Sequence, residues 1–119
     1  LLIRIIIMKN YNQPGDTLTL AAPSGGVVSG TAYLIGAGIF GVASQTAAVG
    51  VDFALKTSGV FELPKTSALA IAVGDLLYWD NTNKELNKTA SGNTLVGVAV
   101  AAAVNPSATV RIKLILTAG

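Results

Sequence analysis

Apolar residues in this chain come in short runs, and turn-forming residues interrupt them every eight to fourteen positions. The segment VDFALKT at residues 51–57 alternates apolar and polar side chains, which is the period of a strand with one buried face. Within it we expect Val51, Phe53 and Leu55 to face inward. Short runs separated by turns are typical of strands rather than of helices. The pattern therefore predicts an all-β fold, a small β-barrel or sandwich of short antiparallel strands.

The rest of the chain divides in the same way. The last strand is expected in ATVRIKLIL (108–116), with Val110, Ile112 and Leu114 inward and the two cations between them outward. Residues 66–73 are ambiguous, because their Ala and Leu also permit a helical turn. Further strands are expected in TLTL (17–20), VVS (27–29), AYLIG (32–36), IFGVAS (39–44), VFEL (60–63), LLYW (76–79), ELNKT (85–89) and TLVGVAVAAAV (94–104).

A faint internal repeat runs through these strands. IFGVAS at residues 39–44 is similar to LVGVAV at residues 95–100, and the Gly-Thr before AYLI is similar to the Gly-Asp before LLYW. Glycines between or within strands indicate bulges or sharp bends. Two related β-units packed into one barrel would produce this repeat, and chance similarity over so few residues is the alternative.

The composition excludes several classes of function. The chain has no Cys and no His, which removes disulfides, thiol nucleophiles, thiolate zinc sites and imidazole mechanisms. The formal net charge is +2 and no run of Lys and Arg occurs, so nothing indicates a nucleic-acid partner. Charged residues make up only 12% of the chain, which suits a surface that neighbouring molecules cover. We therefore expect a structural component of an assembly.

The glycine-rich stretch GAGIFG at residues 36–41 has the spacing G-x-G-x-x-G. A dinucleotide-binding loop needs a helix after this motif, and here a turn and an alternating strand follow. The chain also lacks any Gly-Lys pair, which excludes a P-loop. We interpret the glycines as structural and expect no cofactor.

The acidic residues and the aromatic pair Tyr78 and Trp79 are candidate site residues. Three acids lie in turns that they can cap, and Asp52 should point outward, so we expect solvated carboxylates and no metal site. A paired-carboxylate hydrolase is a remote alternative. Tyr78 and Trp79 could stack on a sugar, but we favour core packing because alternation buries one of them. The six acids are Asp16, Asp52, Glu62, Asp75, Asp80 and Glu85.

The N-terminal LLIRIII is too short to cross a membrane, and Arg4 interrupts it, so no membrane partner is expected. Its β-branched residues favour an extended strand. Two interpretations of residues 1–7 are open: an extension upstream of a start at Met8, or part of an arm that adds a strand to a neighbour. We predict an N-terminal arm at residues 1–12 and one β-barrel-like domain at residues 13–119.

Several segments together resemble a family of phage capsid cement, or head-decoration, proteins that were long described as proteins of unknown function. The resemblance covers nearly all of residues 8–116 in order and spacing, and LLIRIII precedes the family's usual first Met. The matching segments are KNYNQPGD (9–16), VVSG (27–30), GVFELPK (59–65), VGDLLYWD (73–80), GNTLVGVA (92–99) and the strand at 109–114.

The resemblance implies a non-enzymatic protein on the outer surface of the virion head that bridges neighbouring major capsid subunits. It also implies a homo-oligomer, with a trimer favoured, and an N-terminal arm that pairs with a capsid strand. A carbohydrate-binding head decoration that uses Tyr78 and Trp79 is the alternative. The candidate capsid contacts are Ile3, Ile5, Ile7, Lys9, Asn10 and Tyr11.

Overall fold

The computed structural model of the chain describes residues 16–115. These residues form nine strands and no helix, so the predicted all-β fold is confirmed. No helix long and apolar enough to cross a membrane is therefore found in this part of the chain. The strands are β1 (Thr17–Ala21), β2 (Ala32–Ile35), β3 (Ile39–Ala43), β4 (Asp52–Lys56), β5 (Val60–Pro64), β6 (Leu76–Asp80), β7 (Glu85–Asn87), β8 (Thr94–Ala99) and β9 (Thr109–Leu114).

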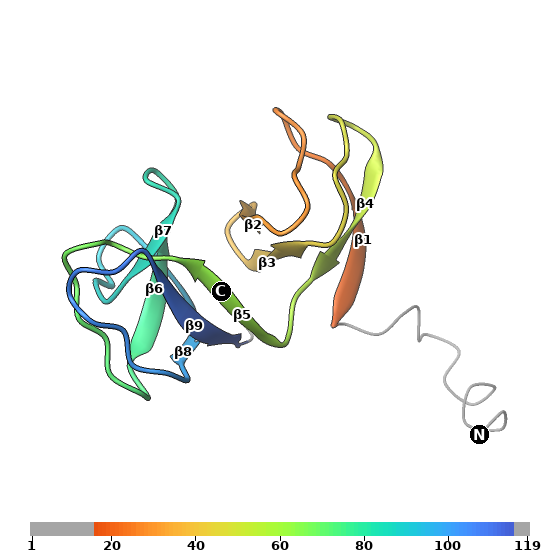
Figure 1. Cartoon of the computed structure of the whole chain (residues 1–119). Coiled ribbons are helices and arrows are strands. Elements are labelled where there is room, and N and C mark those ends of the chain that lie inside the picture. Colours follow the sequence, from red (N-terminus) through yellow and green to blue (C-terminus); the bar gives the residue numbers. More distant parts are fainter. Residues whose placement is uncertain (1–15, 116–119) are drawn as a thin grey trace, which may run out of the picture.

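The strands form two antiparallel sheets that lie side by side (Figure 1). The first unit, residues 17–56, holds a four-stranded sheet in the order β1-β4-β3-β2. The second unit, residues 60–114, holds a five-stranded sheet in the order β5-β9-β8-β6-β7. Its two edges approach each other at a parallel bridge between Lys65 and Leu86. Neither sheet closes into a barrel, so of the two predicted architectures the sandwich is the one observed.

The internal repeat is a structural repeat. Strands β1, β2, β3 and β4 pair in the same order as β5, β6, β8 and β9. In the first unit the Gly30 N–H donates to the Ala43 carbonyl at 2.8 Å, and the Ala43 N–H donates to the Thr31 carbonyl at 3.0 Å. Gly74 and Ala99 make the equivalent bonds at 2.8 and 2.9 Å. Both glycines have positive φ, 84° and 93°, so each unit carries the same glycine-dependent bulge.

Close contact between strands explains the Gly-Val-Ala that the two units share. A Cβ placed on Gly97 would lie 2.5 Å from the Lys113 carbonyl oxygen and 2.6 Å from Ile112 side-chain atoms. A Cβ on Gly41 would likewise collide with the Lys56 carbonyl oxygen. Each glycine therefore lets its strand approach the last strand of its own unit.

The first sheet is apolar on both faces. Phe40 and Val42 point toward the second unit, where Phe40 packs on Trp79 with ring centroids 5.1 Å apart. Phe53 and Leu55 lie on the opposite face in a second core cluster, which the unit's own loops help to cover. One core cluster therefore spans both units.

Burial confirms most of the predicted inward positions. Phe53, Leu55, Val110, Ile112 and Leu114 are all buried. Val51 was predicted inward and is 53% exposed, so that prediction is wrong. The cause is a turn in which the Val51 N–H donates to the Ala48 carbonyl, so that β4 begins one residue later. The ambiguous segment 66–73 and the expected strand 27–29 are loops with one isolated bridge each.

Candidate functional site

The acids in turns accept hydrogen bonds from nearby backbone N–H groups. Asp75 accepts a hydrogen bond from the Ala72 N–H at 2.8 Å and pairs with Lys88 at 3.3 Å; these contacts, the backbone bond first, lower the pKa of Asp75. Asp80 accepts from the Asn83 backbone at 3.1 Å and from its side-chain amide at 2.8 Å, which lowers the pKa of Asp80. Asp75 and Asp80 therefore both accept hydrogen bonds from the backbone of their own turns, as the sequence predicts.

The remaining acids are also dispersed. Glu62 accepts a hydrogen bond from Thr109 across β5 and β9 at 2.7 Å, and Glu85 accepts one from Thr66 at 2.7 Å. Asp52 is exposed, as predicted. Within residues 16–115 no group of three acidic side chains is placed to hold a metal ion.

The glycine-rich motif lies at the hairpin between β2 and β3. Ile35 pairs with Ile39, and Gly36 takes a φ of 63° in the turn between them. Strand β3 follows the turn directly, and residues 42–115 contain no helix. The structural interpretation of these glycines is therefore confirmed.

Trp79 is a core residue. It is 2% exposed, its ring packs on Phe40, and its indole N–H donates to Asn81 Oδ1 at 3.1 Å. Stacking on a sugar requires an exposed aromatic face, which Trp79 lacks. Core packing is confirmed for Trp79, while Tyr78 is half-buried.

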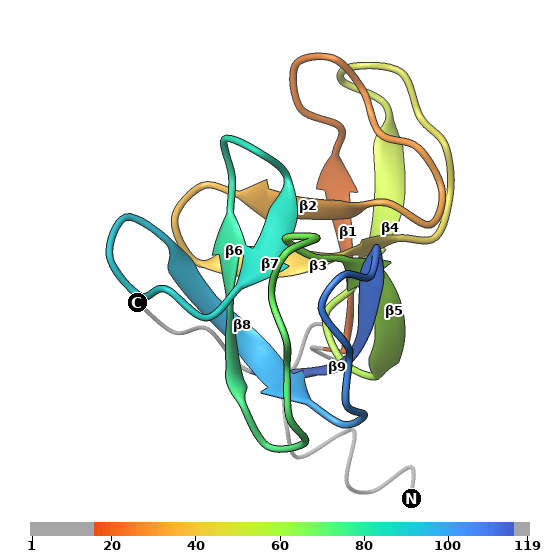
Figure 2. The ribbon, with the colours of Figure 1, turned by 60° about the vertical axis from the view of Figure 1, so that its left-hand side comes forward.

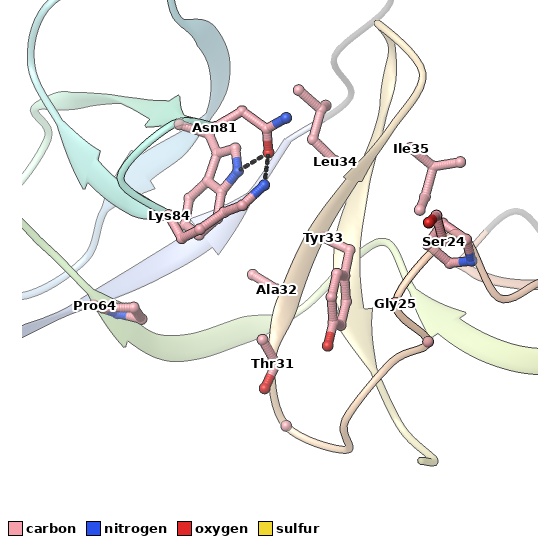
Figure 3. A pocket seen from close by; sticks show the side chains of 14 residues that line it. Ser24, Gly25, Thr31, Ala32, Tyr33, Leu34, Ile35, Pro64, Asn81 and Lys84 are labelled. Atoms are coloured by element: carbon pink, nitrogen blue, oxygen red, sulfur yellow. Dashed lines mark hydrogen bonds between the residues drawn. The ribbon is translucent and has the colours of Figure 1, made fainter. Parts of the chain in front are cut away.

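A groove of about 550 Å³ runs between the two units (Figure 3). Strand β2 forms its floor, the loop at residues 23–26 forms one wall, and the turn between β6 and β7 forms the other. Lys84 lies in that turn, where its Nζ donates to Asn81 Oδ1 at 2.8 Å. Its φ of 57° is left-handed, a conformation uncommon for residues other than glycine. The lining residues are Pro23, Ser24, Gly25, Gly26, Gly30, Thr31, Ala32, Tyr33, Leu34, Ile35, Pro64, Trp79, Asn81 and Lys84.

Sequence reasoning missed the structural role of Lys65. This side chain is 3% exposed, and its Nζ donates to the carbonyl oxygens of Thr66, Ser67 and Leu69 at 2.7, 3.1 and 2.6 Å. The ammonium group therefore satisfies three carbonyls of the loop after β5. The only signal in the sequence is its place at the end of the GVFELPK segment.

Large apolar side chains are exposed on loops of both units. The first unit contributes Val28, Val49 and Val51, and the second contributes Val73 and Val104 among others. Val104 and Val73 are 71% and 67% exposed, values unusual for valine. The predicted arm contacts Ile3, Ile5, Ile7, Lys9, Asn10 and Tyr11 lie outside the described residues.

The fold and its surface define the class: a small all-β protein built from two related sheets, with an open groove between them and apolar loops at its surface. The family model for phage cement proteins matches residues 12–114. The chain therefore belongs to the phage cement protein family, and the resemblance seen in its motifs is confirmed. It is thus a structural, capsid-associated component of a phage virion. A search of curated proteins and a search of solved structures found no match.

Proposed function

We propose that this protein binds the outer surface of the phage head, bridges neighbouring major capsid subunits and stabilises the shell. The observation that carries the proposal is the presence of exposed valines on the loops of both units. Residues 17–51 and 94–110, which include most of these loops, contain no charged residue. Uncharged apolar surface of this kind is typical of contact sites.

The two sets of loops point toward different ends of the molecule. The loops at 22–31 and 44–51 extend from one end, and those at 65–75 and 100–108 turn at the other (Figure 2). A molecule with contacts at both ends can touch two capsid subunits at once. Once the first contact has formed, the second is held close to its own site at a high effective concentration. Two modest affinities therefore combine into tight binding without a large single interface.

The N-terminal arm and self-association complete the proposal. Residues 1–12 would add a strand to a neighbour through main-chain hydrogen bonds, with contacts from the isoleucines at 3, 5 and 7. A homotrimer would multiply the contacts of each molecule. Deleting residues 1–10 should weaken binding to heads and leave the two sheets folded.

The test uses purified heads that lack this protein. Added protein should cosediment with the heads, raise the temperature at which they release DNA, and appear in cryo-electron microscopy maps as density on the outer surface between capsid subunits. Mass photometry of the free protein would measure the oligomer. Absence of binding to heads, or density on the inner surface, would refute the proposal.

A further inference from the structure

Within residues 16–115, the structural repeat shows that the first unit lacks one strand that the second unit has. In the second unit β6 is paired on one side with β8 and on the other with β7. Its counterpart β2 is paired with β3 and forms the edge of its sheet. The position beside β2 that corresponds to β7 opens into the groove between the units. The fold therefore presents a place for one more strand.

Hydrogen-bond alternation shows which groups of β2 face that position. The Ala43 N–H donates to the Thr31 carbonyl, and residues of an antiparallel pair alternate between bonding the partner and pointing away. From the register, Tyr33 bonds β3, so the N–H and C=O groups of Ala32 and Leu34 point away from β3. Both residues line the groove. An added strand would find donors and acceptors at the spacing that strand pairing requires.

The walls of the groove define what such a strand must carry. Ser24 and Gly25 lie on one side of β2, and Pro64 and Asn81 lie on the other (Figure 3). A strand covered on both faces is typically a nearly continuous apolar run. Among the described residues that line the groove, Lys84 is the one that is charged, and none is a carboxylate. A carboxylate on the incoming strand would therefore complement the positive charge at the Lys84 end of the groove.

The same charge argues against the chain's own N-terminal segment as the occupant. Residues 1–15 include an apolar run, but they carry Arg4 and Lys9 and no acidic residue. Their insertion would bring further cations toward Lys84 and leave it without a counter-charge. A capsid segment with an acidic residue suits the groove better.

We propose that an extended segment of the major capsid protein, apolar on both faces and acidic near Lys84, pairs with β2 as β7 pairs with β6. This inference rests on the proposed function, because it requires contact with the capsid. It assigns the groove between the units as a strand-addition site, in which main-chain bonds supply affinity and the walls supply selectivity.

The first experiment removes one donor from the open edge. Leu34→Pro eliminates an N–H that points into the groove, and proline is tolerated at a sheet edge with that orientation. Thr19→Pro is the matched control, because the bond from Ala22 N–H to the Val51 carbonyl places the Thr19 N–H on the outer side of β1. We expect at least about tenfold weaker head binding for Leu34→Pro, the cost of one strong hydrogen bond, and less than about twofold change for Thr19→Pro.

Two further measurements keep the test decisive if Leu34→Pro fails to fold. Lys84→Gly suits the left-handed turn and removes the charge, so head binding should weaken by about tenfold and lose part of its salt dependence. Hydrogen-exchange mass spectrometry on the unmodified protein should show slower exchange at residues 31–35 when heads are added. Sheet content and the unfolding temperature of each variant are measured by circular dichroism.

The outcomes separate this inference from the proposed function. If the unmodified protein does not bind heads, the proposed function itself fails. If it binds, but Lys84→Gly binds equally well and exchange at residues 31–35 is unchanged, the groove is not the strand-addition site. If residues 31–35 are already protected without heads and lose that protection when residues 1–10 are deleted, the chain's own arm is the occupant and the inference is overturned.

Discussion

Gly97→Ala should destabilise the protein strongly although it adds only one methyl group. The new Cβ would lie 2.5 Å from the Lys113 carbonyl oxygen, where ordinary contact begins at 3.4 Å. That oxygen belongs to β9, which is paired with β8, so it cannot retreat without breaking the ladder. Overpacking a core typically costs about 1–3 kcal/mol, and the upper end applies here because backbone must move. Alanine also lowers the conformational entropy of the unfolded chain, which offsets less than about 1 kcal/mol of this loss.

The net loss is therefore about 2–3 kcal/mol, which corresponds to a fall in Tm of about 8–12 °C for a domain of this size. Urea denaturation and differential scanning calorimetry measure both quantities. Gly92→Ala is the control: its Cβ meets no atom within 4 Å, so only the strain of its φ of 77° remains, about 1 kcal/mol.

Gly41→Ala, at the equivalent position of the first unit, should behave like Gly97→Ala. Both variants should show one cooperative transition, because a core cluster joins the units. A smaller loss for Gly97→Ala than for Gly92→Ala would refute the explanation of the repeat by close approach. Two separate transitions would refute the single domain.

Three further predictions concern stability. Lys65→Met should lower the free energy of unfolding by about 3 kcal/mol in urea denaturation, because three loop carbonyls lose their donor. Trp79→Ala should cost about 4 kcal/mol by the same measurement, since a buried ring is replaced by a cavity; a loss below about 1 kcal/mol would contradict its core role. Asp75 and Asp80 have pKa values lowered from 3.8 in the folded state, so their stabilising contribution is complete above that pH and disappears as the pH falls through the lowered values. Unfolding temperatures measured from about pH 6 to pH 2 should therefore drop at the acid end, and less steeply for Asp80→Asn.

Alternation along the chain predicted much of the fold because it records which side chains meet the core. Residues 109–114 show this most clearly: Val110, Ile112 and Leu114 are buried and the two cations between them are exposed. The same reasoning failed at Val51, where a turn delays the start of the strand. Periodicity cannot detect such a shift, since it depends on a hydrogen bond to Ala48 rather than on the side chain.

The candidate site depended on contacts that no local pattern encodes. The acids and the glycine-rich hairpin could be interpreted from the sequence, because turns are formed by neighbouring residues. The groove could not, since its floor is β2 and its far wall is Trp79 and Lys84, more than forty positions later in the sequence. Likewise Lys65 is an ordinary cation in the sequence and a buried donor only once its loop folds over it.

By itself, the sequence determined that this chain is all-β and carries the motifs of a cement protein, because side-chain period and family motifs are local properties. It only indicated the repeat, which the hydrogen bonds and positive φ values of Gly30 and Gly74 then established. Tertiary structure alone decided that the sheets stay open, that Phe40 and Trp79 join the units, and that β2 lacks the partner that β6 has in β7. These features depend on which surfaces of distant segments meet, and that is settled only when the whole chain packs.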